Sequence, residues 1–399
     1  MLIYKKKIMN ITLFDGIYHK NLLPLTYTKP VSKLRVGILT IKEKWEHFIE
    51  NPIQIKTQDY LSKKFGDEII ENSMGINGSV LPNDDLMSSL LELKNNQILT
   101  KKGNVIAINP LPTSTENLSE ILSTYKKVET KADFLQIENV WDIFKLNDQA
   151  IREDIELIKD TKTFVTPSET NQILGEEVFI EEGAKVECVI LNSTTGPIYI
   201  AKDAEVMEGS MLRGPIALCE NGVIKMGAKI YGATTIGPYS KVGGEVNNCV
   251  IQGYSNKGHD GFLGNSVIGE WCNLGADSNN SNLKNNYQSV DVYNYVEEKY
   301  VDTELQFCGL IMGDHSKSAI NTMFNTGTVV GVSANIYGAD FPSKFIPSYS
   351  WGGRKPLEYK FEKAMDTAKR VMERRDIALT EDDLEILQIV WDLSKKYRK

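Results

Sequence analysis

Residues 253–286 read GYSNKGHDGFLGNSVIGEWCNLGADSNNSNLKNN and decide the fold. They place His259 in a glycine-rich loop, directly before two six-residue steps whose aliphatic positions are Ile268 and Leu274. A short fixed period of this kind is typical of a solenoid. The same step recurs on both sides of the loop, at Ile200, Val206, Leu212, Ile224, Ile230, Ile236 and Val242 upstream and at Met312, Ser318, Phe324, Val330 and Ile336 downstream.

The six-residue step predicts a triangular parallel β-helix. Each step would form one face of a coil, with its aliphatic side chain inside and a small residue, usually Gly or Ala, at the corner. The alternative is a β-sandwich with frequent turns, but a sandwich would show apolar and polar residues alternating over longer runs. We expect an α/β domain over residues 1–170, the β-helix over 171–345 and a helical tail over 346–399.

The 399-residue chain has an ordinary globular composition, with 41% hydrophobic and 25% charged residues. Neither a long apolar run nor a signal peptide is found, the latter in MLIYKKKIMN, so we expect a cytoplasmic protein without a membrane span. The net charge of -8 argues against a nucleic-acid partner. The five scattered cysteines, with no CxxC pair, predict buried thiols rather than disulfides or a zinc site.

The N-terminal region predicts a strand, a loop and a helix at the start of the α/β domain. ITLF at residues 11–14 is the strand, and the helical pattern begins with TIKEKWEHFIE at residues 40–50. Clustered cations between a strand and its helix can bind phosphate, and the alternative is a solvated basic loop. The cations of this loop are Lys20, Lys29, Lys33 and Arg35.

Two acidic residues, Asp84 and Asp85, follow the end of a predicted strand at LPN. They would either hold Mg²⁺ for phosphate chemistry or cap the helix DDLMSSLLEL, and capping is the commoner role for Asp at such a place.

Two further helical regions are expected. Residues 132–160 have a helical period, with Trp141, Ile143 and Phe144 as buried anchors at the end of the first domain. In the tail, Thr380 followed by acidic residues indicates a helix N-cap. We therefore expect two short tail helices that pack on the solenoid or on a neighbouring subunit.

His259 is the candidate catalytic base. A neutral imidazole near pH 7 can take a proton from an amine, and Asp260 or a backbone carbonyl could orient the ring. The turn GHDG does not bury a core side chain easily, whereas His315 in GDHSKS is expected to face solvent at a strand end. Amide side chains follow about one coil further on, at Asn279, Asn280, Asn282, Asn285 and Asn286.

Two motifs resemble known families. LLPLTYTKPVSKLRVG at residues 22–37 resembles the LRPLTxxxPKxLLPVG segment of the sugar-1-phosphate nucleotidyltransferases, although DGIYHKN replaces their GxGTR loop. GHDGFLGNSVIGEWCNLGADSNNSNLKNN resembles the acetyltransferase site of bifunctional N-acetylglucosamine-1-phosphate uridylyltransferase/glucosamine-1-phosphate acetyltransferase, in its shorter bacterial form. The resemblance implies a left-handed β-helix, a homotrimer with sites between subunits, acetyl-CoA and UTP as substrates, and Mg²⁺ for nucleotidyl transfer.

The resemblance also implies roles for single residues. His259 falls on the general base and Asn282 on the Asn that positions the sugar amine. Phe262 stands at a Tyr position, Asn248 at a Lys position and Tyr231 near an Arg position of the sugar-phosphate site, where Lys241, Lys257 and Lys284 could anchor the substrate instead. Acetyl-CoA is expected near the small residues Ala319, Gly331 and Ala334, and the nucleotide near Asp15, Lys29 and Arg35.

The function predicted from the sequence is synthesis of a sugar nucleotide. The solenoid would acetylate glucosamine-1-phosphate with acetyl-CoA, and the N-terminal domain would then transfer a uridylyl group to the product. Three alternatives remain open: an acetyltransferase with a non-catalytic N-terminal domain, a nucleotidyltransferase acting on another sugar-1-phosphate, and a non-catalytic protein that binds sugar nucleotides.

Overall fold

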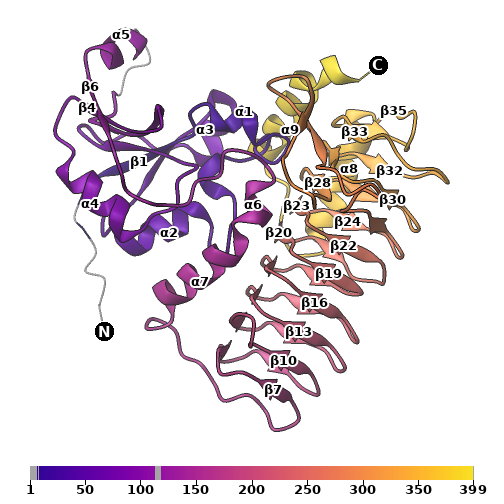
Figure 1. Cartoon of the computed structure of the whole chain (residues 1–399). Helices are drawn as coiled ribbons and strands as arrows, with labels where there is room; N and C mark the ends of the chain where they lie inside the picture. The colour runs from indigo at the N-terminus through magenta and orange to yellow at the C-terminus, as the bar shows by residue number, and fades with distance from the viewer. Residues whose placement is uncertain (1–6, 8, 113–117, 399) are drawn as a thin grey trace. The chain divides into compact units, whose positions relative to one another are not determined.

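The computed structural model describes residues 7, 9–112 and 118–398, and the chain forms two compact units (Figure 1). The first unit comprises Met1–His19, Lys29–Leu34 and Leu39–Glu138, and the second comprises Lys20–Thr28, Arg35–Ile38 and Asn139–Lys399. The stretch on which the prediction of no signal peptide rests lies mostly outside the described residues. Across the described residues, no helix has the length and hydropathy needed to cross a bilayer.

The first unit is built on a six-stranded mixed sheet. β1 pairs in parallel with both of its neighbours, β5 runs antiparallel to β3 and β4, and β6 is parallel to β4. The predicted strand at ITLF is therefore confirmed as β1, in the interior of the sheet. The spatial order is β2 (Gln54–Lys56), β1 (Ile11–Phe14), β3 (Met74–Asn77), β5 (Asn104–Asn109), β4 (Gln97–Lys101) and β6 (Lys126–Glu129).

The predicted helix after the cationic loop is α2 (Ile41–Phe48). Thr40 and Glu43 form a capping box at its start. Trp45 is fully buried and its indole Nε1 donates to the carbonyl oxygen of Val80 at 2.9 Å, so one side chain fixes the helix in the core. The other helices of the region are α1 (Tyr18–Asn21), the 3-10 turn η1 (Val31–Lys33), α3 (Asp59–Phe65), α4 (Asp84–Glu92) and α5 (Leu118–Ser123).

The second unit is a parallel β-solenoid with three sheets, whose strands rise as a ladder in Figure 1. The first sheet contains β7 (Gln172–Leu174), β10 (Ile190–Asn192), β13 (Met211–Arg213), β16 (Lys229–Tyr231), β19 (Glu245–Asn247) and β22 (Phe262–Gly264). The second contains β8 (Val178–Ile180), β11 (Ile198–Ile200), β14 (Ile216–Leu218), β17 (Thr234–Ile236), β20 (Val250–Gly253), β23 (Val267–Glu270), β28 (Leu310–Met312), β31 (Thr328–Val330) and β33 (Phe345–Ile346).

The third sheet carries the candidate site. It contains β9 (Lys185–Val186), β12 (Glu205–Val206), β15 (Val223–Ile224), β18 (Lys241–Val242), β21 (Asn256–Lys257), β24 (Asn273–Leu274), β29 (Lys317–Ser318), β32 (Asn335–Ile336) and β34 (Ser350–Trp351), and β35 (Leu357–Glu358) closes it in the antiparallel sense. A separate parallel pair is formed by β25 (Asn279–Asn280) and β30 (Met323–Phe324).

The register of the strands explains the six-residue period. Ile200, Leu218 and Ile236 are paired in adjacent strands and lie 18 residues apart, which is three steps of six. The aliphatic positions predicted from the sequence all lie in one buried core, except Ser318, which is buried outside this apolar cluster. The predicted fold class, an α/β domain followed by a parallel β-helix and a helical tail, is confirmed.

Two coils depart from the regular length. The pairing of Ile236 with Ile251 shortens one coil to 15 residues, and the pairing of Ile268 with Met312 lengthens another to 44. The longer coil contains an antiparallel hairpin, β26 (Asp291–Asn294) with β27 (Lys299–Asp302). Both irregular coils border the His259 loop, so the repeat is broken where the candidate site lies.

The helical regions differ from the prediction at one end. Residues 132–139 are not helical, and the helices begin at α6 (Asp142–Lys145) and α7 (Asn147–Ile158). The three anchors Trp141, Ile143 and Phe144 are buried as predicted. Asn147 of α7 donates to the carbonyl oxygen of Ala233 at 2.8 Å, so this helix packs with the solenoid.

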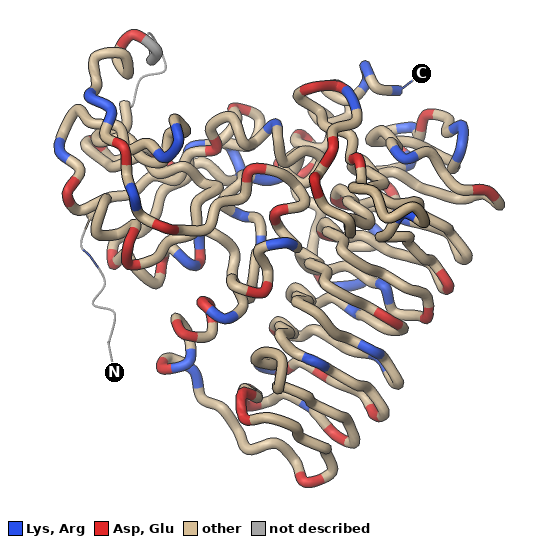
Figure 2. Tube along the Cα trace, viewed as in Figure 1, with Lys and Arg blue, Asp and Glu red and all other residues tan. Residues whose placement is uncertain are grey.

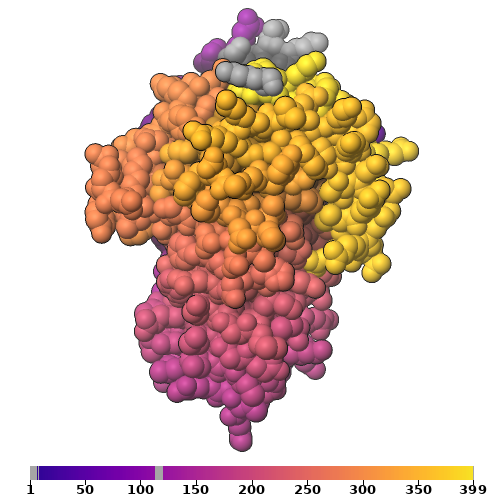
Figure 3. All heavy atoms as spheres, turned by 90° about the vertical axis from the view of Figure 1, so that its right-hand side faces the viewer, coloured from indigo at the N-terminus to yellow at the C-terminus, as the bar shows by residue number. Residues whose placement is uncertain are grey.

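The tail forms α8 (Phe361–Glu373), α9 (Glu381–Leu393) and the turn η2 (Lys395–Tyr397). Thr380 caps α9 in a capping box with Asp383, which confirms the predicted N-cap. The tail lies along the flank of the coils (yellow in Figure 3), and Tyr349 of the solenoid donates to the carbonyl oxygen of Leu387 at 2.7 Å. All five thiols are free; four are buried as predicted, and Cys188 is exposed, contrary to the prediction.

Candidate active site

Polar side chains form a row on the outer face of the third sheet. Lys241, Asn256, Asn273 and Lys317 are paired in register on four successive strands. Because side chains alternate between the faces of a strand, the residues that follow them point inward. The row therefore offers hydrogen-bonding and charged groups to anything that lies along this face.

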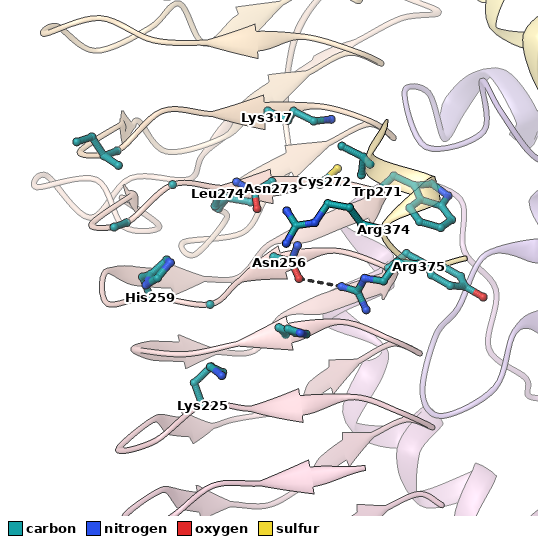
Figure 4. A pocket seen from close by; sticks show the side chains of 17 residues that line it. Lys225, Asn256, His259, Trp271, Cys272, Asn273, Leu274, Lys317, Arg374 and Arg375 are labelled. Atoms are coloured by element: carbon teal, nitrogen blue, oxygen red, sulfur yellow. Dashed lines mark hydrogen bonds between the residues drawn. The ribbon is translucent and has the colours of Figure 1, made fainter. Parts of the chain in front are cut away.

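A cleft of about 680 Å³ lies between this row and the end of α8 (Figure 4). Val371, Arg374 and Arg375 contribute from the tail. Lys225, Lys241, Lys317 and His259 contribute from the solenoid, together with Tyr254, Asn256, Gly258, Trp271, Cys272, Asn273, Leu274, Gly275, Ala276 and Ile320. We refer to this cavity as the cationic cleft.

The electrostatics of the cationic cleft favour an anionic ligand. Among the described residues that line it there are five Lys or Arg side chains and neither Asp nor Glu. Burial lowers the pKa of Lys317 to about 8. Burial, and then Arg375, Lys225 and Arg374, lower the pKa of Lys241. Cations also recur on successive coils (blue in Figure 2), and bound phosphate groups would relieve their mutual repulsion.

His259 lies at the corner between two faces of the solenoid. It belongs to the loop that joins β21 of the third sheet to β22 of the first, and its side chain is exposed at the edge of the cationic cleft (Figure 4). The backbone beneath it is closely packed, because a Cβ atom at Gly244 would approach the His259 carbonyl oxygen to 2.9 Å and Cα of Asp260 to 2.8 Å. The imidazole therefore projects from a fixed backbone.

A second cluster lies on the other side of this corner. A Cβ atom at Gly264 would meet Cζ of Phe262 at 2.5 Å and Nδ2 of Asn282 at 2.7 Å, so these two side chains meet over β22. Asn282 donates to Oδ1 of Asn265 at 2.8 Å. The structure thus places Phe262 and Asn282 together, near the first sheet, and neither lines the cationic cleft.

The remaining residues predicted to bind the sugar phosphate are separated. Tyr231 of β16 donates to Oε1 of Glu245 at 2.7 Å, and Asn248 follows β19 with a positive φ of 54°. Lys284 pairs with Asp291 at 3.0 Å. Of the three predicted lysine anchors, only Lys241 lines the cationic cleft, while Lys257 is buried inside the solenoid.

The placement predicted for acetyl-CoA needs a correction. The side chain of Ala334 lies in the solenoid core, and a Cβ at Gly331 would meet the backbone nitrogen of Ser348 at 2.2 Å, so neither residue faces a cavity. Ala319 lies between Ser318 and Ile320 and accepts hydrogen bonds from Ser278 and Thr322. Small residues in this repeat fill core and corner positions, so residue size did not locate the cleft. The cations of α8 were missed because only the folded tail brings them there.

The first unit has its own pocket, of about 500 Å³, beside the strand β1. Asp15 lines it and accepts hydrogen bonds from the Val31 backbone at 2.8 Å and from the Thr57 hydroxyl at 2.6 Å. Burial raises the pKa of Asp15 to about 6, although these hydrogen bonds oppose the shift. Lys56, which the sequence analysis missed, also lines the pocket, and burial lowers its pKa.

The two cations predicted to bind the nucleotide do not line this pocket. Lys29 is buried in the first unit, and Arg35 belongs to the second. The Arg35 guanidinium donates to the carbonyl oxygen of Ile38, and its backbone exchanges two hydrogen bonds with the Gln252 side chain, at 2.7 and 3.0 Å. Arg35 thus holds the chain against the solenoid, which corrects its predicted role.

A magnesium site is not formed by the predicted carboxylates. Asn83 is the N-cap of α4, and Asp84 and Asp85 are exposed in its first turn. Within the described parts of the chain, no group of three or more His, Cys, Asp or Glu side chains could hold a metal. Both carboxylate oxygens of Asp15 already accept hydrogen bonds. These residues do not fit a protein-built Mg²⁺ site, and we derive no step through a metal.

Comparisons with known proteins agree with the two motifs. Residues 11–163 match the family model of the sugar nucleotidyl transferases. A bifunctional sugar-1-phosphate nucleotidylyltransferase/acetyltransferase of Sulfurisphaera tokodaii is 25% identical over 214 residues, covering 53% of this chain and 47% of that protein. The bifunctional protein GlmU of Alkaliphilus metalliredigens is 23% identical over 259 residues, covering 52% and 54%. The predicted resemblance to such bifunctional proteins is confirmed, and the chain spans about half the length of these curated relatives.

Among solved structures, the polysialic-acid-specific acetyltransferase NeuO is 13% identical, with a TM-score of 0.25 and coverage of 48% of this chain and 87% of that protein. The UDP-N-acetylglucosamine acyltransferase of Arabidopsis is 14% identical, with a TM-score of 0.23 and coverage of 59% and 99%.

Proposed function

We propose that this chain is a bifunctional sugar-1-phosphate nucleotidyltransferase/acetyltransferase, with acetyl transfer in the solenoid and nucleotidyl transfer in the first unit. The observation that carries the acetyltransferase half is the cationic cleft, which has no lining carboxylate and ends at His259. Acetyl-CoA carries several phosphate groups at one end and a thioester at the other. Its phosphates would lie among Lys225, Lys241, Arg374 and Arg375, with the thioester near the imidazole.

The proposed reaction uses His259 as a general base. The neutral imidazole takes a proton from the amino group of an amino sugar phosphate as the nitrogen attacks the thioester carbonyl. The C–N bond forms, the C–S bond breaks, and the leaving thiolate takes up the proton. Phe262 and Asn282 lie beyond the His259 corner from the cleft, where the sugar would enter. Glucosamine-1-phosphate is the proposed acceptor, by analogy with the resembling family.

The test of the base compares two histidines. His259→Ala should lower acetyl transfer about a hundredfold or more, the usual contribution of a positioned base, with no change in thermal melting. His315→Ala is the control, because His315 stacks on Trp271 with ring centroids 6.3 Å apart and does not line the cleft. If His259→Ala keeps its activity, or if His315→Ala alone abolishes activity without changing the melt, the base is wrongly assigned.

Nucleotidyl transfer is proposed for the pocket beside β1, with UTP and N-acetylglucosamine-1-phosphate as substrates. The match of residues 11–163 to the sugar nucleotidyl transferases supports it. A specific observation favours the alternative, an acetyltransferase with a non-catalytic first unit: Lys56 is the one Lys or Arg among the described residues that line this pocket. Incubating the protein separately with acetyl-CoA plus glucosamine-1-phosphate and with UTP plus N-acetylglucosamine-1-phosphate, with added Mg²⁺, decides between the two.

A homotrimer is proposed for the assembly, because the resembling family assembles through its solenoids. A second subunit would cover the exposed imidazole and complete the acceptor site. Light scattering over a range of concentrations should give three times the 44.8 kDa chain mass, and a concentration-independent monomer would refute the assembly.

A further inference from the structure

Lys257 occupies a core position that the repeat otherwise fills with aliphatic side chains. It is paired with Val242 of the preceding strand and is followed one coil later by Leu274, both of which lie in the solenoid core. Only 3% of Lys257 is exposed. A buried ammonium group is costly unless it is hydrogen-bonded, so its presence at this height of the core needs a compensating role.

The Lys257 ammonium binds the backbone of the His259 loop from inside the solenoid. Nζ donates to the carbonyl oxygen of His259 at 2.5 Å and to the carbonyl oxygen of Gly243 at 2.9 Å. Burial lowers the pKa of Lys257 to about 8, while Asp260 and Asp277 act in the opposite direction and favour the charged form. The charge is thus retained to hold two carbonyl groups on adjacent coils.

The loop is supported from three sides. Lys257 contacts it from within, the backbone at Gly244 packs beneath it, and the backbone nitrogen of Asp277 donates to the carbonyl oxygen of Asp260 at 3.1 Å above it. The loop also joins the first and third sheets at the coil that is shortened to 15 residues, where the usual corner geometry does not apply. A buried donor at this corner replaces the support that a regular step would give.

We propose that Lys257 is a positioning residue for His259: its ammonium fixes the loop carbonyl and thereby the direction in which the imidazole projects. This role replaces the substrate contact predicted from the sequence, because a side chain committed to two carbonyl groups inside the solenoid does not reach the cationic cleft. The inference rests on the proposed function only in naming the imidazole as the base. The hydrogen bonds to the loop stand without it.

The experiment uses Lys257→Met, which keeps the length and apolar stem of the side chain and removes the donor. Ile224→Met is the matched control, because Ile224 lies in the same column of the core, one coil below Val242, and does not line the cleft. Hydrogen exchange of the full-length protein, followed by mass spectrometry on peptides that span residues 258–262, reports the order of the loop without any activity measurement.

For Lys257→Met we expect loop exchange to be faster by about tenfold or more, because the anchored carbonyl is released, and kcat to fall by a similar factor. The KM values for acetyl-CoA and the amino sugar should stay within about twofold, because ground-state binding is unchanged. Ile224→Met should leave loop exchange and kcat as in the wild type. Unchanged exchange in Lys257→Met, or a raised KM for the amino sugar at constant kcat, would overturn the proposal.

Two safeguards keep the result decisive. If Lys257→Met does not fold, Lys257→Gln retains one N–H donor and should show loop exchange between that of the wild type and a fully released loop; wild-type exchange in a folded Lys257→Gln paired with wild-type kcat would also count against the strut. If His259→Ala retains activity, the base assignment fails, yet the exchange measurement on Lys257→Met still decides whether Lys257 holds the loop.

Discussion

Arg375 and Asn256 are hydrogen-bonded, with Nη2 of the arginine donating to Oδ1 of the asparagine at 3.1 Å (Figure 4). A second guanidinium nitrogen donates to the carbonyl oxygen of Tyr239 at 2.6 Å. These contacts join the end of α8 to the row of polar side chains on the third sheet. The tail is thus one wall of the cationic cleft, and its removal would leave the row open to solvent.

We therefore expect the double variant Arg374→Ala, Arg375→Ala to raise the KM for acetyl-CoA by about tenfold or more, since each charged hydrogen bond to phosphate contributes roughly 1.5–3 kcal/mol. The control is Lys369→Ala, Arg370→Ala, which removes the same charge from exposed positions of α8 that do not line the cleft. Steady-state kinetics with acetyl-CoA varied checks both. Equal effects of the two pairs would mean that the cleft acts only through overall charge.

The thiols provide a test of the solenoid core. Burial raises the pKa of Cys249, Cys272 and Cys308 to about 12, and thiolate is the reactive form, so these groups should be inert in the folded protein. Cys188 is exposed. Titration with an aromatic disulfide reagent should therefore give one fast thiol in the native protein and five after denaturation. Cys188→Ser should abolish the fast phase, and a fast phase that survives would contradict the packing of the coils.

The repeat could be read from the sequence because each six-residue step repeats one local rule. Ile200, Leu218 and Ile236 obey it, and the core follows directly. The candidate site could be read only in part. His259 stands out in its glycine-rich loop, but the cleft beside it depends on Arg374 and Arg375, more than a hundred residues later.

The misplaced residues have physical reasons. Ala334 looked suited to a ligand because it is small, but small residues also fill the interior of a narrow coil. Lys257 looked like a surface anchor because lysine is rarely buried, and nothing in a single sequence announces that its neighbours offer two carbonyl groups. Arg35 follows the nucleotidyltransferase motif, yet its backbone is bound by Gln252, a contact made across 217 residues. Long-range contacts of this kind leave no local pattern.

The buried ammonium group makes stability depend on pH. The pKa of Lys257 is lowered from 10.5 to about 8 by burial, despite Asp260, Asp277 and Cys249, which favour the charged form. Between these values the unfolded chain binds more protons than the folded one, so the free energy of unfolding of the wild type should rise with pH relative to Lys257→Met, by about 3 kcal/mol in total. Below pH 8 the difference should be constant. Urea denaturation at several pH values measures it, and a difference that does not change between pH 8 and 10.5 would contradict the buried charge.

The last prediction separates the position of the His259 loop from backbone strain. Gly244 has a φ of 71°, and a Cβ atom there would lie 2.9 Å from the carbonyl oxygen of His259. Gly227 has nearly the same φ, 69°, with nothing within 4 Å of its Cβ position. Alanine at either position should cost about 1–2 kcal/mol, because left-handed backbone is unfavourable for residues with a Cβ.

Only Gly244→Ala should push the loop outward, since the backbone atoms that its Cβ meets cannot rotate away. We expect it to lower acetyl transfer about a hundredfold, the effect of displacing a catalytic group by roughly 1 Å, whereas Gly227→Ala should keep its rate. Comparing the two variants at equal fractions folded removes the common cost of the left-handed backbone. If both lose activity equally, strain alone accounts for the loss, and if neither does, the imidazole does not depend on this backbone.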